Sequence, residues 1–83
     1  MTRDQYLELN QARLRLALRD RGYDRDVADC LKRLTTEGWE YSLQRINGKY
    51  GMIFFGKNIR HYEVFDELED AVFFAILSLE VKK

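Results

Sequence analysis

The sequence predicts a single small α+β domain spanning residues 1–83, and three observations predict its order of elements. Apolar side chains recur at helical spacing over residues 1–37, alternate with polar ones after residue 38, and return to helical spacing after residue 66. Asn47-Gly48 lies between two strand-like runs and is a strong hairpin signal, because both turn residues must take a positive φ angle. The predicted order is α-α-β-β-β-α, with a three-stranded antiparallel sheet packed by the C-terminal helix.

Length and charge limit the classes of protein that fit. The 83 residues allow one domain, divided into a two-helix N-terminal part (1–37) and a β-meander with the C-terminal helix (38–83). The 14 basic and 14 acidic side chains give a formal net charge of zero, so the charge balance does not require nucleic acid. No apolar run approaches the ~20 residues that span a membrane. The N-terminus shows no basic stretch followed by an apolar core, and the one cysteine, Cys30, cannot form an internal disulfide. Together these features favour a cytoplasmic protein with no membrane partner.

The first helix is predicted to run from Thr2 to about Arg21. Thr2 and Gln5 match a capping box, and Gly22 supplies the C-terminal stop. Two apolar stripes lie on nearly opposite sides of this helix, one with Leu7, Leu14 and Leu18 and the other with Leu9, Ala12 and Leu16. Either the helix packs between two other elements, or one stripe contacts a partner or a second copy of the chain.

A second helix, with Asp24 as its N-cap, is predicted to end at Gly38, and a hairpin follows it. A two-residue turn pairs Ile46 with Lys49 and places the alternating apolar side chains on one core face: Trp39, Tyr41, Leu43, Tyr50, Met52 and Phe54. The opposite face carries Ile53 and Phe55, where a solvated face would be polar. Either the first two helices cover these two side chains, or they are exposed for binding.

The third strand is predicted over residues 60–65, with a register that is ambiguous by one residue. Asp66 is the predicted N-cap of the last helix, with Glu69 three residues further on, and the helix is expected to run to about Val81. Apolar side chains surround this helix almost completely, which is typical of a central helix. Phe73 and Leu77 also belong to an apolar surface larger than a chain of this length comfortably buries.

Signals for catalysis are weak. His61 is the one histidine and Cys30 the one cysteine, so a nucleophilic pair would need these two side chains adjacent in space and a third group to orient them. One histidine and one cysteine also give no zinc-ligand spacing. The carboxylates at residues 66–70 match a helix start, and the sequence contains no phosphate-binding glycine motif. We therefore expect no enzyme activity, no metal and no cofactor.

Three short motifs carry a family resemblance: Gly48-Lys49-Tyr50, Gly56-Lys57 and Tyr62-x-x-Phe65-Asp66-x-x-Glu69-Asp70-Ala71. Through them, residues 39–80 resemble the AP2-type module of phage integrases and homing nucleases, in which a three-stranded sheet packs on a helix. That family inserts its sheet into a DNA groove through Arg and Lys side chains, so the resemblance implies a DNA-binding sheet. This chain has Tyr50 where the family has Trp, and Met52 and Phe54 on its second strand.

These observations favour a non-enzymatic protein that binds a macromolecule. The chain is similar in size and character to small bacterial or phage immunity and anti-defence proteins, which inhibit a protein partner. The partner-binding candidates are its surplus apolar side chains and one arginine: Ile53, Phe55, Arg60, Phe73 and Leu77. Self-association as a homodimer belongs to the same hypothesis. The alternative is DNA binding through basic side chains of the sheet: Arg45, Lys49, Lys57 and Arg60.

Overall fold

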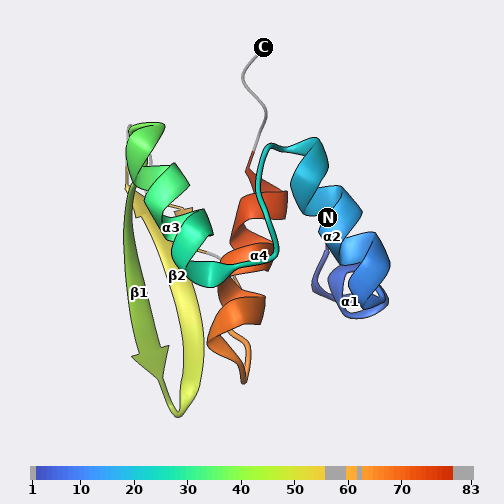
Figure 1. Ribbon diagram of the computed structural model, residues 1–83. Coiled ribbons are helices and arrows are strands. Elements are labelled where there is room, and N and C mark those ends of the chain that lie inside the picture. The colour runs from blue at the N-terminus through green and yellow to red at the C-terminus, as the bar shows by residue number, and fades with distance from the viewer. Residues whose placement is uncertain (1, 56–59, 62, 80–83) are drawn as a thin grey trace.

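Helix α4 occupies the middle of the computed structural model, between the strands on one side and the first two helices on the other (Figure 1). The structure describes residues 2–55, 60–61 and 63–79, and the side chains of residues 60 and 61 are not among them. The elements follow one another as α1 (Arg3–Leu7), α2 (Gln11–Asp20), α3 (Val27–Thr36), β1 (Glu40–Ile46), β2 (Lys49–Phe55), β3 (Arg60–His61) and α4 (Leu68–Ser78).

The N-terminal segment forms two helices where the sequence predicts one. The predicted capping box is confirmed, because the Thr2 side chain accepts from the Gln5 N–H and the Gln5 side chain accepts from the Thr2 N–H. Helix α1 nevertheless ends at Leu7, and α2 begins after Asn10, whose side-chain oxygen accepts from the Arg13 N–H at 2.8 Å. An asparagine within the helical pattern therefore starts a new helix.

This break divides the predicted apolar stripe of Leu7, Leu14 and Leu18 between α1 and α2. Leu14 and Leu18 of α2 are buried toward α4, whereas Leu7 on α1 is 55 % exposed and Leu16 on the other side of α2 is 62 % exposed. Helix α2 thus packs on one side only, so the first of the two alternatives, a helix packed between two other elements, is wrong.

The starts of the later helices also differ from prediction. Asp26, and not Asp24, caps α3, since its carboxylate accepts from the Asp29 N–H at 3.0 Å. Glu67 is the N-cap of α4 and makes no side-chain capping bond, while the carboxylate of Asp66 lies 3.9 Å from the Lys49 ammonium. Helix α4 ends at Ser78, before the predicted end near Val81, a residue outside the described part of the chain.

The predicted hairpin and its register are confirmed. Ile46 pairs with Lys49, Leu43 with Met52, and Tyr41 with Phe54. Asn47 (φ 52°) and Gly48 (φ 77°) both occupy the left-handed region that a two-residue turn of this kind requires.

The predicted three-stranded sheet is wrong. Two seven-residue strands, β1 and β2, form an antiparallel hairpin, and the third strand is reduced to Arg60–His61, which pairs with Ile53 and Phe54. If that register continued, Tyr50 would lie opposite Val64. It lies opposite Phe65 instead, and each residue donates its N–H to the other's carbonyl oxygen, with N to O distances of 2.7 and 2.8 Å. One extra residue on this segment interrupts the ladder.

Burial of Phe65 accounts for the interruption. The shifted register places its ring on the core face, where its centroid lies 5.4 Å from the Tyr6 ring and 5.3 Å from the Phe74 ring. Val64 then falls on the opposite face, against the backbone of Gly51. Unbroken pairing would exchange these two faces and expose the larger side chain, so core packing outweighs the ladder hydrogen bonds.

Helix α4 is the central helix that the sequence predicts. Every side chain from Ala71 to Leu77 is at most 4 % exposed, because β2 and α3 pack on one side and α2 on another. The start of α4 also anchors α1, since the Tyr6 hydroxyl donates to the Asp70 carboxylate at 2.8 Å. Burial and this carboxylate raise the pKa of Tyr6 above its usual value, which keeps the hydroxyl a donor.

Substituting Gly48→Val should destabilise the hairpin, since a β-branched residue at φ 77° costs at least about 1–2 kcal/mol. For a domain of this size the melting temperature should fall by roughly 4–8 °C per kcal/mol, measured by circular dichroism. Gln44→Val introduces the same side chain at an exposed strand position and should leave the melting temperature nearly unchanged. Equal melting temperatures for both variants would contradict the turn assignment.

Substituting Tyr6→Phe should lower the free energy of unfolding by about 1.5 kcal/mol, the low end for a hydrogen bond to a charged group, because Asp70 remains half-buried. Asp70→Asn retains an acceptor oxygen and should lose less. Urea unfolding of the three proteins measures both effects, and an unchanged Tyr6→Phe midpoint would show that the bond does not hold α1 in place.

Candidate functional site

The predicted protein-binding residues do not form one surface. Phe55 is 39 % exposed, on the sheet face opposite the core, and its neighbour Ile53 is only 9 % exposed. Phe73 (1 %) and Leu77 (3 %) lie inside the core on α4. Arg60 belongs to β3, and its side chain is outside the described part of the chain. Of the described side chains in this set, only Phe55 is exposed enough to meet a partner.

The basic residues proposed for DNA are also separated. Arg45 pairs with Tyr50 on the core face of the hairpin, with its guanidinium 5.8 Å from the ring centroid. Lys49 pairs with Ile46 on the opposite face and lies 3.9 Å from the Asp66 carboxylate. The Lys57 and Arg60 side chains fall outside the described residues. The two described cations therefore point to different faces and do not line one groove-reading surface.

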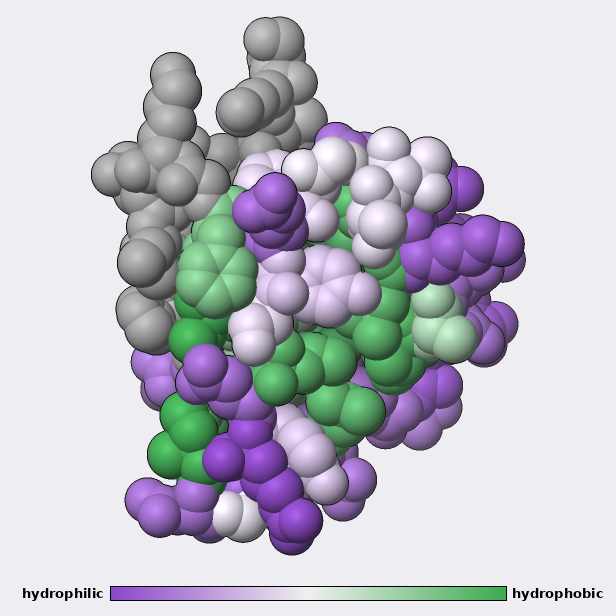
Figure 2. Space-filling view, turned by 90° about the vertical axis from the view of Figure 1, so that its left-hand side faces the viewer, coloured by the Kyte–Doolittle hydropathy of each residue, from purple (hydrophilic) through white to green (hydrophobic). Residues whose placement is uncertain are grey.

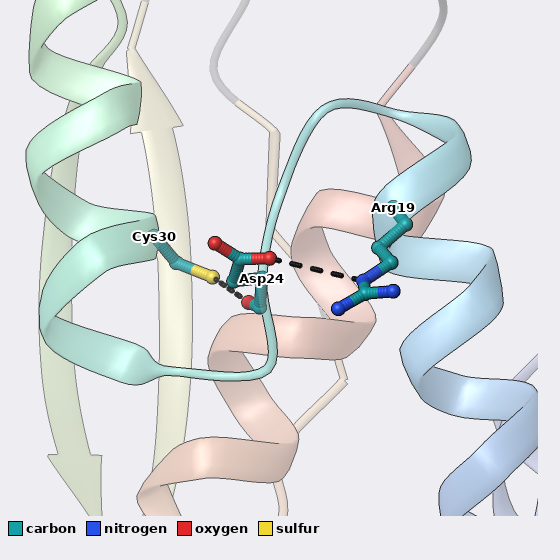
Figure 3. Close-up of polar contacts among 3 residues, drawn as sticks. All are labelled: Arg19, Asp24 and Cys30. Carbon is teal, nitrogen blue, oxygen red and sulfur yellow. Dashed lines mark hydrogen bonds and ion pairs between the residues drawn. The ribbon is translucent and has the colours of Figure 1, made fainter.

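The chemistry around Cys30 is that of an inert thiol (Figure 3). Its sulfur is buried at the start of α3 and donates to the Asp24 carbonyl oxygen at 3.1 Å. Burial raises the pKa of the thiol from 9.0 to about 11, so the nucleophilic thiolate is scarce at neutral pH. Within the described part of the chain, no three His, Cys, Asp or Glu side chains gather as a metal site.

A hollow of about 210 Å³ opens beside the loop that joins α2 to α3, where Figure 3 shows Arg19 facing Asp24. Arginines and aspartates line it together: Arg15, Arg19, Asp24, Arg25 and Asp26. The Arg19 Nε lies 4.0 Å from the Asp24 carboxylate, and both side chains are mostly exposed. Because the opposite charges largely offset one another, this hollow provides no strong preference for an anion or a cation.

An apolar row along β1 is the surface that the sequence analysis missed. The row consists of Trp39, just before β1, and of Tyr41 and Leu43 within it, and all three side chains are half-buried. Their cross-strand partners on the same face of β2, Phe54 and Met52, are each 1 % exposed. The sheet therefore extends sideways beyond the helices that cover it, and β1 is the strand left partly uncovered.

Figure 2 shows the side of the molecule on which β1 lies. Hydrophobic surface gathers across the middle of this side, and hydrophilic surface lies below it and to its right. Trp39 is held in place by an edge-on contact with Phe54, at 5.5 Å between ring centroids. Half-buried Val27 and Leu31 of α3 pack on the same core cluster as the apolar row. The alternating pattern of residues 39–43 predicted a core face correctly, but not that one strand of it would be partly open.

The backbone of β1 is also open along one edge. β1 is an outer strand, and among the described residues it pairs with β2 alone. Tyr50 directs its N–H and C=O away from β1, to Phe65. In an antiparallel pair of this kind both residues point their backbone groups away from each other, so the N–H and C=O of Arg45 point away from β2. By strand alternation the N–H and C=O groups of Tyr41 and Leu43 point to the same open edge.

No family model, no curated protein and no solved structure matches this chain. The resemblance of residues 39–80 to the AP2-type module and the likeness to immunity proteins therefore stay predictions. None of the described helices is long and apolar enough to cross a membrane.

The Cys30 thiol should make stability fall between pH 9 and 11. The unfolded thiol ionises near 9.0 and the folded one near 11, so over this window the unfolded state holds fewer protons and the free energy of unfolding drops as pH rises. Cys30→Ala lacks this contribution. The difference in free energy of unfolding between the wild type and Cys30→Ala, measured by urea unfolding with a reductant, should shrink by about 2 kcal/mol from pH 8 to 11. A difference independent of pH would contradict the raised pKa.

Proposed function

We propose that this chain is a non-enzymatic protein-binding domain whose contact surface is the apolar row of Trp39, Tyr41 and Leu43 together with the open edge of β1. One observation carries the proposal: on a single sheet face, Met52 and Phe54 of β2 are buried, while their β1 partners Leu43 and Tyr41 are only half-buried and have backbone groups unpaired among the described residues. Such an edge adds a strand from a partner, which supplies main-chain hydrogen bonds, while side chains along it supply selectivity.

The residue types support a protein partner. Trp and Tyr dominate binding energies because they bury large areas at a low entropic cost. The Phe54 contact also keeps the Trp39 ring ordered before binding. An inhibitor of the immunity or anti-defence type, acting in the cytoplasm, is the form of this proposal that suits a small chain of zero net charge. Such a protein acts by occupying a surface of its target, and needs no catalytic group.

Leu43→Lys should abolish partner binding and leave the fold intact, because the lysine stem can cover the same surface while its charge disfavours an apolar contact. Leu16→Lys is the matched control, since Leu16 is exposed on α2, away from β1. Tagged wild-type and variant proteins are compared by pull-down from cells that express the chain, with circular dichroism to verify folding. A partner retained by Leu43→Lys but lost from Leu16→Lys would contradict the proposal.

The DNA alternative is checked with the same proteins. A labelled random duplex is titrated by fluorescence anisotropy at ~50 and ~200 mM salt, where phosphate contacts would weaken affinity steeply. We expect no binding at either salt concentration. Binding at low salt that Arg45→Ala removes and Leu43→Lys retains would replace the protein-binding proposal with a nucleic-acid one.

A further inference from the structure

The open edge of β1 is complementary to a second copy of itself. The backbone N–H and C=O groups of Tyr41, Leu43 and Arg45 point to this open edge. The same groups of a second β1 have the same alternation along the strand and can pair with them. In an antiparallel pair that uses all three, Leu43 lies opposite Leu43 of the second copy. Tyr41 then lies opposite Arg45, once on each side of the two-fold axis.

Charge favours this antiparallel arrangement over a parallel one. Glu40 stands at one end of β1 and Arg45 near the other. Because side chains alternate, Glu40 and Arg45 lie on opposite faces and do not pair directly. Antiparallel pairing nevertheless keeps the two Arg45 side chains apart, each opposite Tyr41 of the other copy, whereas parallel pairing would bring the two arginines together. The formal net charge of zero also means that two copies do not repel one another as whole molecules.

The Arg45 contact within the chain shows what the second copy would offer. Arg45 already lies over the ring of its cross-strand partner Tyr50, at 5.8 Å from the centroid. Across the open edge, Tyr41 of the second copy takes the equivalent position, so the guanidinium would lie between two tyrosine rings. The two-fold axis is perpendicular to the sheet, and the two apolar rows therefore join on one face of a continuous sheet.

We propose that two copies of this chain form a symmetric dimer by antiparallel pairing of their β1 edges, centred on Leu43. This inference rests on the proposed function, because it names the partner that occupies the same surface. The dimer buries the Tyr41 and Leu43 side chains of both copies and satisfies the backbone groups of both edges.

Light scattering after size exclusion should give twice the chain mass of 10.0 kDa over a wide range of protein concentrations. Arg45→Pro should abolish the dimer and leave a folded monomer, because its N–H points to the open edge and is not used by the hairpin. Gln44→Pro is the matched control: its N–H faces β2, so this variant should lose hairpin stability. Arg45→Ala keeps the backbone donor and should give a weaker dimer.

Oxidative cross-linking tests the register. Leu43→Cys places two thiols opposite each other at the two-fold axis, where a paired-strand Cα separation of about 5.5 Å permits a disulfide. The proposal predicts a covalent dimer for Leu43→Cys. It predicts none for Gln44→Cys, whose side chain lies on the other face and opposite Ser42 of the second copy. Native Cys30 is buried and stays protected until denaturation, when a thiol-blocking reagent is added.

A wild-type chain that is monomeric at every concentration would overturn the dimer. A dimer that Arg45→Pro leaves intact, or that Gln44→Cys cross-links as well as Leu43→Cys, would place the contact elsewhere and overturn it too. A monomer that still binds another protein in a Leu43-dependent way would retain the proposed function and remove only this inference. A monomer whose binding to another protein is unchanged by Leu43→Lys would contradict both the dimer and the proposed function.

Discussion

The burial of helix α4 on all sides is the constraint on which the arrangement of the other elements depends. Seven successive side chains, Ala71 to Leu77, have to leave water, and each large one contributes roughly 1.5–3 kcal/mol when fully buried. A helix with no polar side requires neighbours in several directions, which β2, α3, α2 and the Tyr6 ring provide. The short helix α1 completes this enclosure, held by the hydrogen bond from Tyr6 to Asp70.

The candidate binding surface is a consequence of that enclosure. Covering α4 requires β2 directly, and β1 is present because a single strand cannot satisfy its own backbone groups. The helical layer is too narrow to cover both strands, so Met52 and Phe54 are buried while Tyr41 and Leu43 are only half-buried. The same geometry leaves the outer edge of β1 unpaired among the described residues. A partner strand would supply both the missing cover and the missing hydrogen bonds.

Competition between hydrogen bonding and packing shapes the opposite edge of the sheet. Phe65 has to join the ring cluster with Tyr6 and Phe74, and the one-residue register shift that achieves this prevents residues 60–65 from forming the predicted strand. Among the described residues, the edge of β2 is therefore bridged only in part, and the long regular edge is that of β1. Core packing on one side of the sheet thus decides which edge is suited to a partner.

The sequence by itself determined the features whose causes lie within a few residues: the Thr2 capping box, the Asn47-Gly48 turn with its register, and the apolar circumference of α4. Asn10 is an equally local signal for an N-cap, but the apolar spacing continues past it and predicts one unbroken helix. Tertiary structure alone decided that Phe65 breaks the third strand, that Phe73 and Leu77 are core, and that Trp39, Tyr41 and Leu43 stay partly open. Burial depends on which elements pack over a residue, and alternation along one strand specifies a face without specifying what covers it.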